Sequence, residues 1–193
     1  MDKRQLIIKR LVLGAVLSAL VIILQMIGQF IRIGPFSISL VLVPIVIGAA
    51  LGGIGVSIWL GFVFSTVVIL TDASAFLAIN PLATVVVVFL KGIGCALVSA
   101  LIYKTFEKKH PNIGIVSSSI ICPIINTGIF VLGCFLFFFS NLSDWGIQSG
   151  YNNTFEYILI GMVGVNFLIE LGVNAILSPV IIRIINISKL RKS

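Results

Sequence analysis

Long apolar stretches alternate with short polar segments along the whole chain, and each apolar stretch approaches the length of a membrane-spanning helix. A helix needs about 20 apolar residues to cross the hydrocarbon core of a bilayer. The charged residues fall almost entirely between or beside these stretches. The pattern predicts an all-α integral membrane protein, one domain over residues 1–193 with six transmembrane helices at residues 8–31, 37–51, 54–70, 82–103, 113–139 and 157–187.

The second and third helices are predicted from one uncharged stretch, residues 37–70, which is too long for a single ordinary span. A cluster of glycines between residues 48 and 55 interrupts its middle, so we divide the stretch into two short helices joined by a glycine turn. The polar segments 32–37, 71–80 and 140–156 are interpreted as loops.

The basic residues give the predicted helices an orientation, because cytoplasmic loops carry an excess of Lys and Arg. Of the 13 such residues, all except Arg32 and Lys91 fall on one side of the membrane when the N-terminus is placed inside. Both termini are therefore expected in the cytoplasm, and the three polar loops are expected outside. The same distribution accounts for the net charge of +7 without a nucleic-acid partner.

The composition narrows the classes of function that the chain can have. Hydrophobic residues make up 59% of the sequence and charged residues only 10%, too few for a surface in water. The three cysteines lie inside apolar stretches without a CxxC or Cys/His pattern, so no metal site or cofactor is expected. The sequence contains no GxxxxGK[ST], HExxH or GxSxG motif, so we expect a protein that is neither an ATPase nor another enzyme.

Two ionisable residues, Lys91 and Glu170, lie within the predicted helices, where such residues are costly and usually face the bundle interior. Asn126 and Asn166 are expected at a similar depth. One interpretation is a buried Lys91–Glu170 ion pair, with the asparagines bonding between helices. The other is a polar pocket for a small molecule that enters from outside, and both can hold together.

Small residues on the first helix form two pairs at a spacing of four, Gly14/Ser18 and Ala15/Ala19. Such pairs allow another helix to approach closely, either within the bundle or from a partner protein.

These features together resemble the substrate-binding S components of energy-coupling-factor (ECF) vitamin transporters. The resemblance rests on six helices with short loops, on Ala15-xxx-Ala19, on the segment 33–40 and on Pro44 followed by the glycine-rich segment 48–53. It implies a multi-pass protein of a prokaryotic cell membrane that binds a vitamin from outside, between helices four to six and under the 32–37 loop. It also implies a transmembrane coupling subunit, which would contact Ala15 and Ala19, and two cytoplasmic ATPases.

The resemblance and the polar residues together predict two sets of contacts. Ligand contacts are expected from Lys91, Asn126, Asn166 and Glu170, with Asn80, Phe36 and Trp145 near the entrance, and partner contacts are expected from Gly14, Ala15, Ser18 and Ala19.

The substrate and the transport mechanism stay open at this level. Lys91 could bind a carboxylate, such as that of pantothenate, unless Glu170 neutralises it first. The phenylalanines between residues 135 and 139 could stack on a ligand or face lipid. The alternatives to an S component are a self-sufficient secondary transporter or channel coupled through Glu170, and a purely structural membrane subunit.

Overall fold

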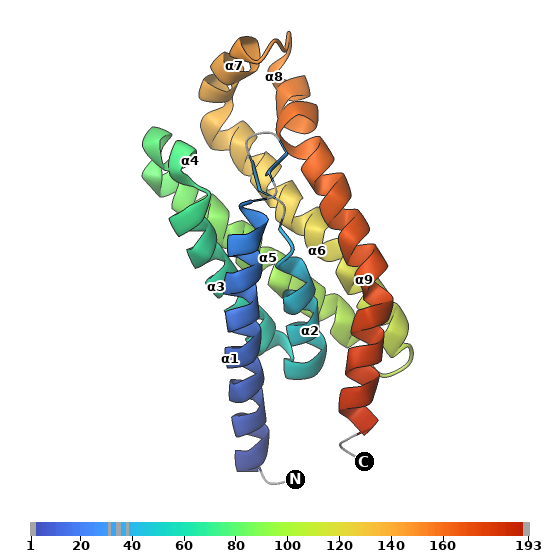
Figure 1. The fold of residues 1–193 in the computed structure, drawn as a ribbon. Coiled ribbons are helices and arrows are strands. Elements are labelled where there is room, and N and C mark those ends of the chain that lie inside the picture. Colours follow the sequence, from blue (N-terminus) through green and yellow to red (C-terminus); the bar gives the residue numbers. More distant parts are fainter. Residues whose placement is uncertain (1–2, 31, 34–35, 38, 191–193) are drawn as a thin grey trace.

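Five helical segments in the described part of the chain are long and apolar enough to cross a membrane, at Arg4–Gly28, Ile54–Thr71, Pro81–Phe106, Pro111–Gln148 and Thr154–Ile187. The computed structural model describes the backbone of residues 3–30, 32–33, 36–37 and 39–190, and the side chains of residues 4–30 and 39–187. The chain folds into a helical bundle whose described ends lie at the same end of the molecule (Figure 1).

The elements follow one another in a simple order. They are α1 (Lys3–Gly28), β1 (Arg32–Ile33), β2 (Phe36–Ser37), α2 (Leu42–Gly52), α3 (Ile54–Thr71), α4 (Ser74–Ile79), α5 (Pro81–Phe106), α6 (Pro111–Gly133), the π-helix η1 (Cys134–Phe138), α7 (Phe139–Gln148), α8 (Thr154–Glu156), the π-helix η2 (Tyr157–Gly164) and α9 (Val165–Leu190).

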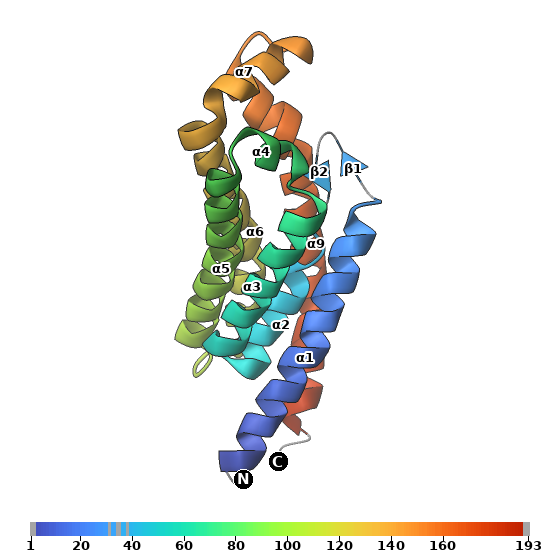
Figure 2. The same ribbon diagram turned by 90° about the vertical axis from the view of Figure 1, so that its left-hand side faces the viewer.

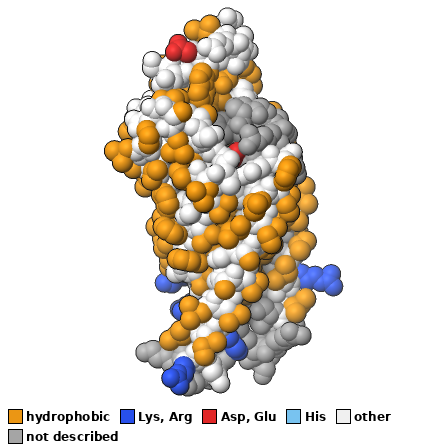
Figure 3. All heavy atoms as spheres, turned by 60° about the vertical axis from the view of Figure 1, so that its left-hand side comes forward, with side chains coloured by type: hydrophobic (Ala, Val, Ile, Leu, Met, Phe, Trp, Pro, Cys, Tyr) orange, Lys and Arg blue, Asp and Glu red, His pale blue; other side chains and the backbone are white. Residues whose placement is uncertain are grey.

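The outside of the bundle is apolar. Large side chains such as Leu11, Val16, Leu136 and Ile176 are more than half exposed, which a water-soluble protein would avoid over so large an area. Figure 3 shows hydrophobic side chains covering the middle of one face, with Lys and Arg gathered toward the end that carries the termini. The prediction of an all-α membrane bundle is confirmed.

The helix α2 is shorter than predicted and is the most enclosed element of the bundle. It begins at Leu42 rather than at residue 37, because residues 36–37 pair with residues 32–33 in a small antiparallel hairpin. All of its 11 residues except Val43 and Leu51 are buried. Gly53 separates it from α3 with a φ of +83°, a conformation that favours glycine. At about 1.5 Å per residue α2 cannot span the membrane alone.

The polar segment 140–156 is largely helical, which corrects the prediction of a loop. The helix of α6 continues through η1 into α7, because Leu142 and Gly146, one turn apart, are buried against the bundle. Trp145 on the same helix contacts the ring of Phe76, with 5.8 Å between the ring centroids. The polar residues of this segment occupy the other face of an amphipathic helix. Because they outnumber the two buried residues, the sequence does not predict a helix here. The segment 71–80 likewise contains the short helix α4.

Glycines bring α3 and α5 into close contact. A Cβ atom on Gly61 would collide with the backbone carbonyl of Gly92, and one on Gly92 would collide with the Ser65 side chain. The hydroxyls of Ser57 and Ser65 donate to the carbonyls of Ala96 and Val88 across the same interface, at 2.9 and 3.0 Å. This packing fixes the helix that carries Lys91.

Two clusters of buried apolar side chains stabilise the bundle. One draws on α1, α2, α3, α5, α6 and α9, and the other joins α4, the start of α5, η1, α7 and η2. Figure 2 shows α4 and the β-hairpin near the end of the bundle from which α7 projects. Polar side chains lie between the two clusters, and they line a cavity.

Candidate ligand-binding site

A cavity opens where the two apolar clusters meet, and both contribute to its walls. Its volume is about 80 Å³, several times the ~10–15 Å³ that one water needs. The lining comes from α1, α3, α4, α5, α6, η1, η2, α9 and residues 39, 72 and 73.

Four of the predicted ligand contacts meet in this cavity. Lys91 comes from α5, Asn126 from α6, and Asn166 and Glu170 from α9. The spacing of four between the two α9 residues places them on one helix face, as expected. Asn174, one turn farther along, is outside the lining and donates its amide N–H to the Glu170 carbonyl at 2.8 Å.

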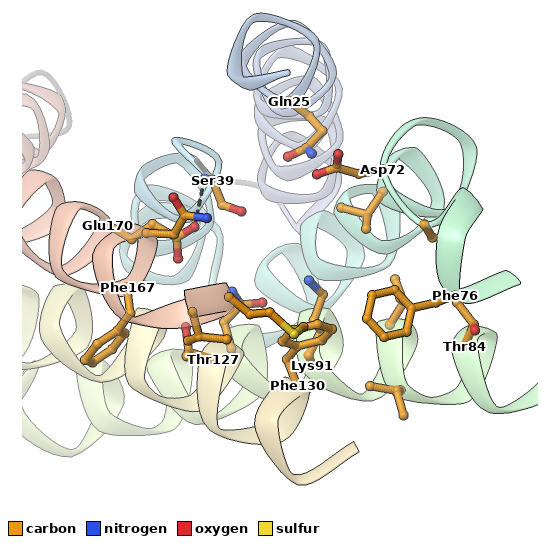
Figure 4. A pocket seen from close by; sticks show the side chains of 18 of the residues that line it. Gln25, Ser39, Asp72, Phe76, Thr84, Lys91, Thr127, Phe130, Phe167 and Glu170 are labelled. Atoms are coloured by element: carbon orange, nitrogen blue, oxygen red, sulfur yellow. Dashed lines mark hydrogen bonds between the residues drawn. The ribbon is translucent and has the colours of Figure 1, made fainter. Parts of the chain in front are cut away.

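The Lys91 ammonium lies over two aromatic rings. Its Nζ atom is 5.2 Å from the centroid of Phe130 and 5.7 Å from that of Phe64. Both distances are within the range of cation–π attraction, which holds a positive charge without neutralising it. The side chain points into the cavity (Figure 4). A cation held in this way can still attract a negatively charged ligand group.

Glu170 is 5% exposed and has a backbone partner. Its Oε1 accepts a hydrogen bond from the Ser39 N–H at 2.8 Å, which connects α9 to the segment leading from the β-hairpin into α2. Within the described residues, Lys91 and Glu170 each have a close contact of their own, and they also attract each other across the cavity, which they enter from different sides (Figure 4). Both charges are therefore presented to the space between them.

The three residues predicted near the entrance have other positions. Asn80 is exposed and caps the N-terminus of α5, since its Oδ1 accepts from the Ala83 N–H at 3.1 Å. Trp145 is outside the lining, and it supports the cavity wall indirectly by packing on Phe76. Phe36 belongs to β2, and its side chain lies outside the described residues.

Several lining residues escaped the sequence reasoning. Gln25 on α1 is one of them, and a polar residue inside an apolar helix is the signal that points to it. Asp72 falls in the segment 71–80 that is predicted as a loop, and Ser39 and Thr84 fall within predicted helices or next to them, where the sequence carries no signal for a site. Among the clustered phenylalanines, Phe138 lines the cavity, while others of the cluster are exposed on the outside of the bundle.

The two small-residue pairs of α1 face different environments. Gly14 is buried, and the Ser18 hydroxyl donates to its carbonyl at 2.7 Å while accepting from the Trp59 indole N–H at 3.0 Å. Ser18 therefore contributes to the contact between α1 and α3. Ala15 and Ala19 are exposed on the outside of the bundle.

A family model for the substrate-specific component of ECF transporters matches residues 9–182, nearly the whole chain. The chain belongs to this family. No curated protein and no solved structure matches it.

An ECF substrate-specific component is a subunit of a transporter, and it works with a small-molecule substrate and with coupling and ATPase subunits. In the described part of this chain, no three His, Cys, Asp or Glu side chains gather as metal ligands would. The polar cavity is consequently the candidate for the substrate site.

Proposed function

We propose that this substrate-specific component binds a vitamin or a related micronutrient in the cavity between α5, α6 and α9, on the outer side of the membrane. The observation that supports this most directly is the convergence of Lys91, Asn126 and Glu170, from three helices, on one cavity. Intramembrane ionisable residues are costly and usually functional, and here they are positioned by contacts that leave them facing that space.

The charges favour a ligand with a carboxylate. Lys91 lies over two aromatic rings, and the carboxylates of Glu170 and Asp72 act on it across the cavity, so a ligand carboxylate can approach its ammonium from the cavity. Glu170 and Asp72 also line the cavity and would accept from hydroxyl or N–H donors elsewhere on the ligand. Pantothenate, which carries a carboxylate and hydroxyl groups, meets this charge requirement.

We propose an orientation with both termini in the cytoplasm. The basic side chains gather at the end of the bundle with the termini, and the cavity lies toward the opposite end, near α4 and the β-hairpin. Ligand would then enter from outside. The transmembrane coupling subunit would contact the exposed Ala15 and Ala19, and two ATPases would act from the cytoplasm.

The first test is mass spectrometry of small molecules that co-purify with the chain expressed without coupling or ATPase subunits. One micronutrient at near-stoichiometric amount is the expected result, because a binding subunit should hold its substrate alone. A protein that is empty after purification, and that moves protons or solute alone in liposomes, would contradict the proposal and point to a carrier using Glu170.

A further inference from the structure

A buried amide without a hydrogen-bond partner marks the α1 side of the cavity. Gln25 is 0% exposed, and neither its Oε1 nor its Nε2 has a partner among the described residues. It lines the cavity, and Figure 4 shows it reaching in from the side opposite Phe130 and Thr127. Buried polar groups in folded proteins are nearly always bonded to protein, water or ligand, so this amide requires an explanation.

Gln25 does not contribute a hydrogen bond to the packing of the described helices. Its neighbours on α1, from Val21 to Ile27, are apolar, and a leucine or methionine there would pack without leaving polar atoms unpaired. Serine hydroxyls elsewhere in the bundle, in contrast, bond to carbonyls across helix contacts, as Ser57 and Ser65 do. An amide kept in this position is therefore most useful to something that enters the cavity.

We propose that the Gln25 side chain is a ligand-binding group, and that it pairs with a neutral edge of the ligand on which an N–H donor lies beside an acceptor. The inference rests on the proposed function and narrows its substrate. A glutamine amide offers one acceptor and a donor nitrogen side by side, so its complement is another amide-like edge. Lactams, cyclic ureas and aminopyrimidines present such an edge.

The aromatic side chains elsewhere in the cavity lining suit a flat ring that carries this edge. Phe76 contacts Phe138 and Phe130 edge-on, with ring centroids 4.9 and 5.7 Å apart, and all three line the cavity together with Met162. Aromatic faces and a thioether pack well on a planar heterocycle. The last torsion of a glutamine side chain is broad, so the amide can turn to follow the ring edge.

An open-chain secondary amide does not provide the same edge. Its trans geometry turns the N–H and the C=O to opposite sides, so only one of them can meet Gln25. The proposal therefore separates ligands with a cyclic amide-like edge from open-chain ligands such as pantothenate.

The experiment exposes the purified full chain to the small-molecule fraction of yeast extract and identifies what it retains by mass spectrometry. Wild type is compared with Gln25→Met, which keeps the size of the side chain and removes both polar atoms. The matched control is Asn174→Leu, because Asn174 is also a fully buried amide with an unpartnered oxygen, but lies outside the cavity lining.

We expect wild type and Asn174→Leu to retain the same compound, one with a cyclic amide-like edge, and Gln25→Met to bind it about 10- to 100-fold more weakly. Retention by wild type of a compound without that edge, or equal affinity of Gln25→Met, would overturn the inference and assign the amide to a buried water. If wild type retains nothing, the proposed function itself fails. The unfolding temperatures of Gln25→Met and Asn174→Leu are compared as well. If they are equal, weaker binding by Gln25→Met is due to the lost ligand contacts and not to misfolding.

Discussion

At the scale of single residues, the cavity combines charges of both signs that have separate partners. Lys91 lies over aromatic rings and Glu170 accepts from the Ser39 N–H, so each has a contact of its own in addition to the attraction between the two charges. This arrangement differs from a buried ion pair, in which removal of one member leaves the other charge uncompensated. Each residue can therefore be changed separately, with a distinct expected result.

Replacing Lys91 by methionine should weaken binding of the co-purified micronutrient about 10- to 100-fold, because a hydrogen bond to a charged group is worth about 1.5–3 kcal/mol. Isothermal titration of the detergent-solubilised protein measures the change. Lys104→Met is the control on the same helix, since Lys104 is exposed in its last turn. Equal losses in the two variants would show that Lys91 does not contact the ligand.

Glu170→Leu should lower the free energy of unfolding by about 1–3 kcal/mol, because the Ser39 N–H would lose its buried acceptor. Glu170→Gln, which keeps an acceptor oxygen, should lose less. Denaturant unfolding in mixed micelles compares them with Glu156→Leu, a change at an exposed glutamate. If Glu170→Leu unfolds like wild type, the contact between α9 and the segment before α2 is unimportant for stability.

At the scale of helices, the close approach of α3 and α5 positions the whole Lys91 wall. The glycine contact at Gly61 and Gly92 leaves no room for a side chain between the two helices. Gly92 directly follows Lys91, so any separation of the helices would also move the ammonium relative to its rings.

Gly92→Ala should therefore destabilise the bundle by about 1–3 kcal/mol and weaken ligand binding as well. Gly128→Ala is the matched control, because a Cβ atom there meets nothing within 4 Å. In an α-helix alanine is favoured over glycine, so the control should be neutral or stabilising. Thermal unfolding followed by circular dichroism measures both, and equal unfolding temperatures would contradict the packing argument.

The sequence was sufficient for the parts of the fold that depend on residue type alone. Apolar length predicted an all-α membrane bundle, and polar residues inside apolar helices predicted Lys91, Asn126, Asn166 and Glu170 as candidates that the fold does bring together. The sequence was insufficient for segments in which a buried face and a polar face lie on the same helix or turn. The buried stripe of α7 was hidden among polar residues, and Asp72 resembled any turn residue until α3 and α4 placed it beside the cavity.

At the scale of the whole molecule, the ligand cavity and the proposed partner surface share helix α1. Gln25 faces the cavity, whereas Ala15 and Ala19 are exposed on the outside of the bundle. Binding of substrate and contact with the coupling subunit should therefore be separable by mutation.

Ala19→Trp should prevent co-purification with the coupling subunit and abolish uptake in cells, because the bulky side chain blocks close helix approach. It should leave binding of the micronutrient by the isolated chain unchanged. Val180→Trp on α9, also exposed on the outside, is the control for a large residue facing lipid. Normal assembly of the Ala19→Trp variant would place the partner elsewhere on the bundle.

The continuous run from α6 through η1 to α7 has a practical consequence for imaging. Its 38 residues have a helical path of roughly 55 Å, longer than the hydrocarbon core of about 30 Å, and α7 projects beyond the rest of the bundle (Figure 1). The chain reverses there at Gly150, whose φ is +84°, between two helical ends. A rigid carrier protein inserted at this reversal would give a small, almost featureless particle the asymmetric landmark that electron cryomicroscopy needs for alignment.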